Sequence, residues 1–82
     1  MSEDIISCLA TYICTDILRQ PQRLLYPSET LITSGLIDSF HLVDIAMFIE
    51  ETYAIQISED EINIANFDTL EKIAALIQSH RN

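Results

Sequence analysis

Apolar residues recur at helical spacing in the first part of the chain. From Ser2 to about Leu18, aliphatic side chains return every three or four positions, as on the buried side of an amphipathic helix. Pro21 follows, and a proline ends a helix because it lacks the backbone N–H that the helix needs. The pattern therefore predicts a first helix over residues 2–18, with a buried stripe of Ile5, Ile6, Leu9, Ile13 and Ile17.

A second helix is predicted from about Ser39 to Tyr53, with Asp38 as its N-cap. On a helical wheel, one apolar face should lie in the core, and its members are Leu42, Ile45, Ala46, Ile49 and Tyr53. The opposite face mixes carboxylates with large apolar groups: Phe40, Asp44, Met47, Phe48 and Glu51. An apolar patch rimmed by charge usually marks an interaction surface. Alternatively, an apolar member of this face packs beneath the preceding loop.

Two capping patterns open the remaining helices. The segment Ser58–Glu61 reads as a capping box that begins a short helical turn. The segment Asp68–Glu71 resembles the same device, with Asp68 as the cap, and begins a last helix. The inward positions of that helix are Leu70, Ile73, Ala74 and Ile77.

The connection between the first two helices, Pro21–Ile37, is long for so small a chain. A loop of this length either packs down on the core or has a function. Gly35, the only glycine, is expected to supply a backbone geometry that other residues resist. The predicted architecture is one all-α domain over residues 1–82, with three longer helices and a short third one. The expected apolar anchors of the loop are Leu24, Leu25, Leu31, Ile32, Leu36 and Ile37.

Charge narrows the classes of partner. The chain has 13 acidic and 4 basic residues, for a net charge of −9. Such a field repels nucleic-acid phosphates and anionic lipids, and it favours proteins with a basic patch. The chain begins with no basic, apolar leader and has no apolar run long enough to span a membrane. We therefore expect a cytoplasmic monomer that binds neither nucleic acid nor membrane.

Side chains suited to catalysis or metal binding are sparse. The only histidines are His41 and His80, and no Gly-x-Ser-x-Gly segment surrounds a serine. His41 is two positions from Ser39, so in a helix the two side chains point in different directions. The acidic run Glu59–Glu61 lacks the spaced ligands and central glycine of an EF-hand loop. We expect neither enzyme activity nor a metal site.

Ser39 stands in the first turn of the predicted second helix. A phosphate ester at this position would meet free backbone N–H groups and the positive end of the helix dipole. Taken alone, the position says little, because many serines at helix starts are simply caps.

The segment from Gly35 to Phe40, Gly-Leu-Ile-Asp-Ser-Phe, resembles the attachment motif of the acyl carrier and peptidyl carrier protein family, usually Gly-x-x-Asp-Ser-Leu. The resemblance extends over nearly the whole chain. It includes the long loop with Leu31, the acidic second helix ending Glu50-Glu51-x-Tyr53, the Ile55-x-Ile57 connection, a short third helix, and a last helix after Phe67-Asp68-Thr69.

This resemblance implies a stand-alone carrier with a four-helix bundle of the acyl-carrier type and no catalytic activity of its own. A phosphopantetheinyl transferase would use coenzyme A and magnesium to attach 4'-phosphopantetheine to Ser39 Oγ. The thiol of that arm would hold acyl or aminoacyl groups as thioesters. Other partners would be a loading enzyme and a downstream synthase or transferase with basic docking patches. They would meet the face formed by Asp38, Phe40, Asp44, Met47, Phe48 and Glu51.

Three positions depart from the family pattern. Phe40 replaces the usual leucine, His41 stands where fatty-acid carriers often have an acid, and Ala54 replaces a residue that is often Gly or Asp. These departures favour a specialised pathway, in polyketide, nonribosomal peptide or aminoacyl transfer. The alternatives are a carrier for fatty-acid synthesis, an unmodified interaction module with the carrier fold, and a small hydrolase that uses Ser39.

Overall fold

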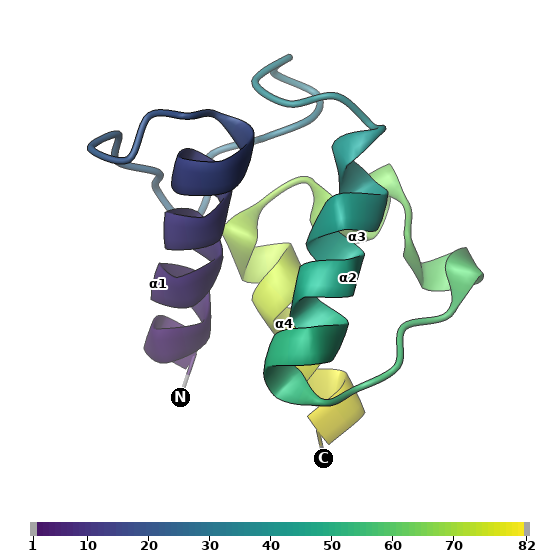
Figure 1. Ribbon diagram of the computed structural model, residues 1–82. Coiled ribbons are helices and arrows are strands. Elements are labelled where there is room, and N and C mark those ends of the chain that lie inside the picture. Colours follow the sequence, from purple (N-terminus) through teal and green to yellow (C-terminus); the bar gives the residue numbers. More distant parts are fainter. Residues whose placement is uncertain (1, 82) are drawn as a thin grey trace.

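Helices account for all the regular secondary structure in residues 2–81, the part of the chain that the computed structural model describes (Figure 1). A π-helical turn, Ile13–Ile17, extends the first helix, and a 3₁₀ turn, Glu59–Glu61, precedes the third. The predicted all-α class, with three longer helices and a short one, is therefore confirmed. The α-helices are α1 (Ser2–Tyr12), α2 (His41–Tyr53), α3 (Ile64–Phe67) and α4 (Leu70–Arg81).

The first helix ends where the sequence predicts. The backbone N–H of Leu18 donates to the carbonyl of Ile13 over 2.9 Å, and that of Gln20 donates to Cys14 over 2.7 Å. The first bond closes the wider π-helical turn, and the second, between residues six apart, is typical of a helix end. Arg19 then adopts a left-handed conformation with a φ of 56°, so the chain leaves the helix just before Pro21.

One core joins all four helices. The helix α1 packs along α4, α3 packs against α4, and α2 lies beside them (Figure 1). The predicted inward residues of α4 are all buried, and so are those of α2 except Tyr53, which is half-buried. The fully buried large side chains are Leu9, Ile13, Leu31, Ile45, Ile49, Phe67, Leu70, Ile73 and Ile77.

The long connection arches over one end of the helices (Figure 1), and five of its six predicted anchors pack against the core. Leu31 and Ile37 are buried, but the prediction for Leu24 is wrong, because its side chain is 77% exposed. The remaining predicted anchors are partly buried against the core: Leu25, Ile32 and Leu36.

Gly35 has the role that the sequence predicts. Its φ is +83°, in the region that favours glycine, and its N–H donates to the carbonyl of Ile32 over 3.0 Å. A Cβ atom added there would have no neighbour within 4 Å. Backbone conformation, and not lack of space, is therefore what favours glycine at this position.

Asp68 does not cap the last helix, which corrects the sequence prediction. The hydroxyl oxygen of Thr69 caps it, accepting from the N–H of Lys72 over 3.1 Å. The Asp68 carboxylate accepts from the N–H groups of Ile32 and Thr33, over 2.9 and 3.0 Å, and from the Thr33 hydroxyl over 2.8 Å. This side chain therefore ties the long loop to the start of α4.

The capping box at Ser58–Glu61 is confirmed. The N–H of Ser58 donates to the Glu61 carboxylate over 3.1 Å. The next helix, α3, has its own cap: the N–H of Asn66 donates to the side chain of Asn63 over 2.9 Å. His80 Nε2 lies 2.9 Å from the same Glu61 carboxylate. The pKa of Glu61 is lowered mainly by the hydrogen bond from the Ser58 N–H and, to a smaller extent, by the hydrogen bond with His80.

We predict that Asp68→Asn lowers the free energy of unfolding by about 2 kcal/mol at pH 7, because it removes charge-assisted hydrogen bonds to the loop. Burial raises the pKa of Asp68, but the N–H groups of Thr33 and Ile32 and the Thr33 hydroxyl lower it further, so the net shift is downward. A lowered folded pKa stabilises the protein above the unfolded value, about 3.9, and the effect is lost as the pH falls through the folded value.

Urea unfolding of both proteins at pH 7 and below pH 3 tests this. The difference between them should be large at pH 7 and should shrink at the acidic pH, as Asp68 of the folded chain takes up a proton. The control Asp16→Asn, at an exposed carboxylate, should change stability by no more than about 0.5 kcal/mol. If Asp68→Asn lowers the free energy of unfolding by the same amount at both pH values, the ionised carboxylate of Asp68 is not what stabilises the loop.

Candidate functional site

The helix α2 begins two residues later than predicted. Its first helical residue is His41 and its N-cap is Phe40, so neither Asp38 as the cap nor Ser39 as the first helical residue is correct. Asp38 and Ser39 instead lie in a tight turn, in which the N–H of His41 donates to the carbonyl of Asp38 over 3.0 Å. The N–H of Leu42 likewise donates to the carbonyl of Ser39 over 3.1 Å. Bonds of this i to i+3 type often tighten a helix end.

The ring of His41 closes this turn from the other side. Its Nδ1 accepts from the backbone N–H of Asp38 over 3.3 Å. This nitrogen is therefore occupied by the backbone of Asp38 and is not directed at the Ser39 hydroxyl.

The side chain of Ser39 is exposed, and its hydroxyl has no hydrogen-bond partner among the described residues. The N–H groups of Ser39 and Phe40 likewise have no backbone partner in residues 2–81, whereas those of His41 and Leu42 do. A group attached to the Ser39 oxygen would thus find open space and two available donors. The sequence predicts free N–H groups at the start of α2. Because this helix starts later, fewer of these groups are free, but those of Ser39 and Phe40 are still available.

The outward face of α2 divides into exposed and packed residues. Phe40 is 86% exposed and Met47 is 53% exposed, as expected for an interaction surface. Phe48 differs, because its ring stacks on that of Tyr12 in α1, with centroids 4.1 Å apart and planes 13° from parallel. Phe48 therefore packs within the protein, which is the alternative to a fully exposed interaction surface. It packs against α1, however, and not beneath the long loop. The helical wheel missed Val43, which is 54% exposed.

Acidic side chains on this face lack basic neighbours. Asp38, Asp44 and Glu51 are exposed, and none forms an ion pair among residues 2–81. The ion pairs that the described residues do form are Arg23 with Glu29, over 3.5 Å, and His80 with Glu61. The face therefore presents uncompensated negative charge.

A small hollow lies between this face and α1. It has a volume of about 260 Å³ and is lined by Tyr12, Asp44, Met47, Phe48 and Glu51. The Tyr12 hydroxyl donates to the carbonyl of Asp44 over 3.3 Å, which fixes its ring. Burial raises the pKa of Tyr12, and the carboxylates of Asp44 and Asp16 raise it further, as expected where the local potential is negative.

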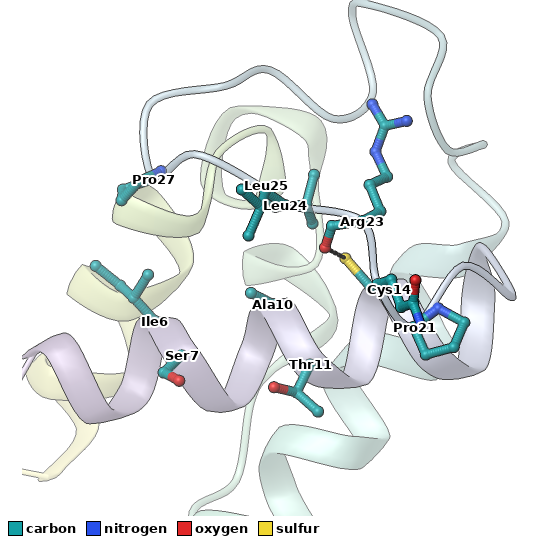
Figure 2. Close-up of a pocket in the computed structure, with 11 residues that line it drawn as sticks. Ile6, Ser7, Ala10, Thr11, Cys14, Pro21, Arg23, Leu24, Leu25 and Pro27 are labelled. Atoms are coloured by element: carbon teal, nitrogen blue, oxygen red, sulfur yellow. Dashed lines mark hydrogen bonds between the residues drawn. The ribbon is translucent and has the colours of Figure 1, made fainter.

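Figure 2 shows a separate hollow of about 450 Å³ between α1 and the segment 21–27. The Cys14 thiol closes one end by donating to the carbonyl of Arg23 over 3.3 Å. Burial is the main cause that raises the pKa of this thiol. The apolar part of the lining is Ile6, Ala10, Leu24, Leu25, Pro21 and Pro27.

No group of three or more potential metal-ligating side chains occurs within the described residues, and none of their helices is long and apolar enough to cross a bilayer. A scan against protein-family models finds no match, and a search of curated proteins also finds none. Functional conclusions for this chain therefore rest on its own residues and their geometry.

We predict that the two phenylalanines of this face differ in their effect on stability. Phe48→Ala should cost about 1–3 kcal/mol, because it removes a half-buried ring that stacks on Tyr12. Phe40→Ala, at an exposed ring, should change stability by less than about 0.5 kcal/mol. Urea unfolding measures both. Equal losses would mean that Phe40 also packs against the protein in solution.

Proposed function

We propose that this chain is a stand-alone carrier protein in which Ser39 holds a 4'-phosphopantetheine arm that bears acyl or aminoacyl thioesters. The observation that supports this most directly is the setting of Ser39. Its unpartnered hydroxyl lies exposed in the turn before α2, directly beside the acidic and apolar outward face of that helix.

The residues around Ser39 fit a covalently attached phosphodiester. The exposed hydroxyl leaves room for a transferase to approach, and the open N–H groups of Ser39 and Phe40 can donate to phosphate oxygens. The Asp38 carboxylate repels the phosphodiester, which favours an arm directed toward solvent. The serine needs no base in this chain, because the transferase that uses coenzyme A can supply one. When attached, the arm provides the thiol on which the cargo is held.

The arrangement of the helices agrees with this proposal. A long loop before α2, a short α3 and a C-terminal α4 occur in the order expected of an acyl-carrier bundle. Ala54, which departs from the family pattern, adopts a left-handed conformation with a φ of 56°. Gly and Asp tolerate this conformation better than most residues, which explains why a carrier would often have them at this position.

The nature of the face beside Ser39 favours a specialised pathway. Phe40 presents a large, exposed aromatic ring where a carrier usually has leucine, and His41 closes the turn where an acid is common in fatty-acid carriers. Partner enzymes of polyketide, nonribosomal peptide or aminoacyl pathways would then need a surface that accommodates the ring. A fatty-acid carrier remains the alternative within this function.

A second candidate function is an interaction module that is never modified. The exposed row of Phe40, Val43 and Met47 on α2 supports it, because these side chains are available to a partner whether or not Ser39 carries an arm. This candidate predicts a partner that binds the Ser39→Ala chain as well as it binds the native chain.

Co-expression with a broad-specificity phosphopantetheinyl transferase should increase the intact mass of the protein by one phosphopantetheine group. The Ser39→Ala chain should show no increment. The matched control is Ser34→Ala, at an exposed serine of the same loop, and it should be modified like the native chain. Absence of the increment in the native chain, or its persistence in Ser39→Ala, would reject the carrier proposal.

Charge reversal on α2 should weaken docking of the same transferase if its docking surface is basic. We expect Glu51→Lys to raise the KM for the carrier by about fivefold, which corresponds to about 1 kcal/mol. Glu59→Lys makes the same charge change at an exposed glutamate of the 3₁₀ turn, outside the outward face of α2, and should have a smaller effect. Equal effects would indicate that net charge, and not the outward face, governs docking.

A further inference from the structure

A larger hollow shares the stacked rings of Tyr12 and Phe48 with the small hollow beside α2. Its volume is about 530 Å³, and both rings contribute to its lining. The remaining walls come mostly from the end of α1 and the π-helical turn. Its polar lining residues are Ser7, Thr11, Thr15 and Asp16.

Three hydroxyl groups in the lining of this hollow have no hydrogen-bond partner among the described residues. Ser7, Thr11 and Thr15 are spaced four apart, so their exposed hydroxyls form a row along one side of the helix. None of the three has a hydrogen-bond partner in residues 2–81. By contrast, the hydroxyls of Ser34 and Ser79 each donate to a nearby backbone carbonyl, over 2.6 and 2.7 Å. These three hydroxyls are therefore free to form hydrogen bonds with a ligand in the hollow.

The charge in this hollow is negative and uncompensated. The Asp16 carboxylate is exposed and has no hydrogen bond or ion pair among the described residues. It belongs, like Thr15, to the π-helical turn that ends the first helix. The upward shift in the pKa of Tyr12, to which Asp16 contributes, agrees with a negative potential at this place.

We propose that this hollow receives the guanidinium group of an arginine from a partner protein. A guanidinium is planar and positively charged, and its five N–H donors suit the carboxylate of Asp16 and the row of hydroxyls. It also binds favourably against aromatic rings such as those of Tyr12 and Phe48. A carboxylate or phosphate would be repelled by Asp16, and an aliphatic side chain would leave the hydroxyls unused.

The position of the hollow indicates a partner protein as the source. Most of its polar lining is exposed, so a ligand would be only partly enclosed, unlike a small molecule in a typical binding pocket. The rings of Tyr12 and Phe48 also line the smaller hollow with Asp44, Met47 and Glu51, so the larger hollow adjoins the outward face of α2. This inference rests on the proposed carrier function, in which partners dock on that face. It extends the docking surface from α2 to α1, and it identifies an arginine of the partner protein as the residue that anchors the complex there.

Titration of the full, ¹⁵N-labelled chain with three blocked tripeptides tests the proposal. The peptides are acetyl-Ala-Arg-Ala-amide, the lysine form, and the citrulline form, which is planar like arginine but uncharged. The arginine peptide should shift the amide signals of Thr11, Thr15 and Asp16 in a saturable way. Its affinity should exceed that of the lysine form by about two- to fivefold, because only arginine combines stacking with several directed donors. The citrulline form should bind more weakly than either.

Two variants locate the site. Asp16→Asn should lower the affinity for the arginine peptide by about two- to fivefold. The matched control, Asp60→Asn, removes an exposed carboxylate of the 3₁₀ turn, which lines neither hollow, and should leave that affinity within about twofold. Equal affinity for the lysine and arginine peptides, shifts centred on Asp44 and Glu51, or no effect of Asp16→Asn would each overturn the proposal.

The titration uses the chain without any arm, so it is independent of the mass measurement on Ser39. Failure of the peptide to bind would remove the arginine hollow and leave the carrier function intact. Failure of Ser39 to be modified, with specific binding of the arginine peptide, would leave the hollow as the site of an unmodified interaction module.

Discussion

The hydrogen bonds that the Asp68 carboxylate accepts from Ile32 and Thr33 tie the long loop to the start of α4. The connection from α1 to α2 has no helix of its own, so its backbone needs partners elsewhere. Asp68 supplies them just before α4, and its own carbonyl accepts from the N–H of Leu31 over 2.6 Å. These bonds place Leu31 in the core. The loop then continues through Ile37, also buried, to the turn that presents Ser39.

A single helix of 13 residues, α2, has to serve both the core and the surface. One side of it is buried with α4, which leaves the other side with a row of apolar groups and uncompensated carboxylates. In a chain with a net charge of −9, this combination favours encounter with a basic protein. Phe48 is the exception on that side, because its ring is used to hold α1.

The stacked rings of Tyr12 and Phe48 connect the two proposals. They fix α1 beside α2 and belong to the lining of both hollows. If partners dock on α2 near Ser39, the same rings bring Asp16 and the hydroxyl row of α1 within the docking surface. The unsatisfied hydrogen-bonding groups there are chemically distinct from the carboxylates of α2, so the two parts of the surface would select different side chains of a partner.

The sequence by itself determined the helices, most of their buried faces, the capping box at Ser58–Glu61 and the special conformation of Gly35. These features depend on periodicity and on residues within a few positions of one another, so local patterns are sufficient to predict them. It also placed Ser39 near the start of α2, although with an error of two residues in the helix boundary. Only the tertiary structure decided the role of Asp68, which bonds to residues 35 and 36 positions away, and the packing of Phe48 on Tyr12. An aspartate before a helix looks the same in the sequence whether it caps that helix or binds a distant loop, because the choice depends on which backbone N–H groups the fold brings to it.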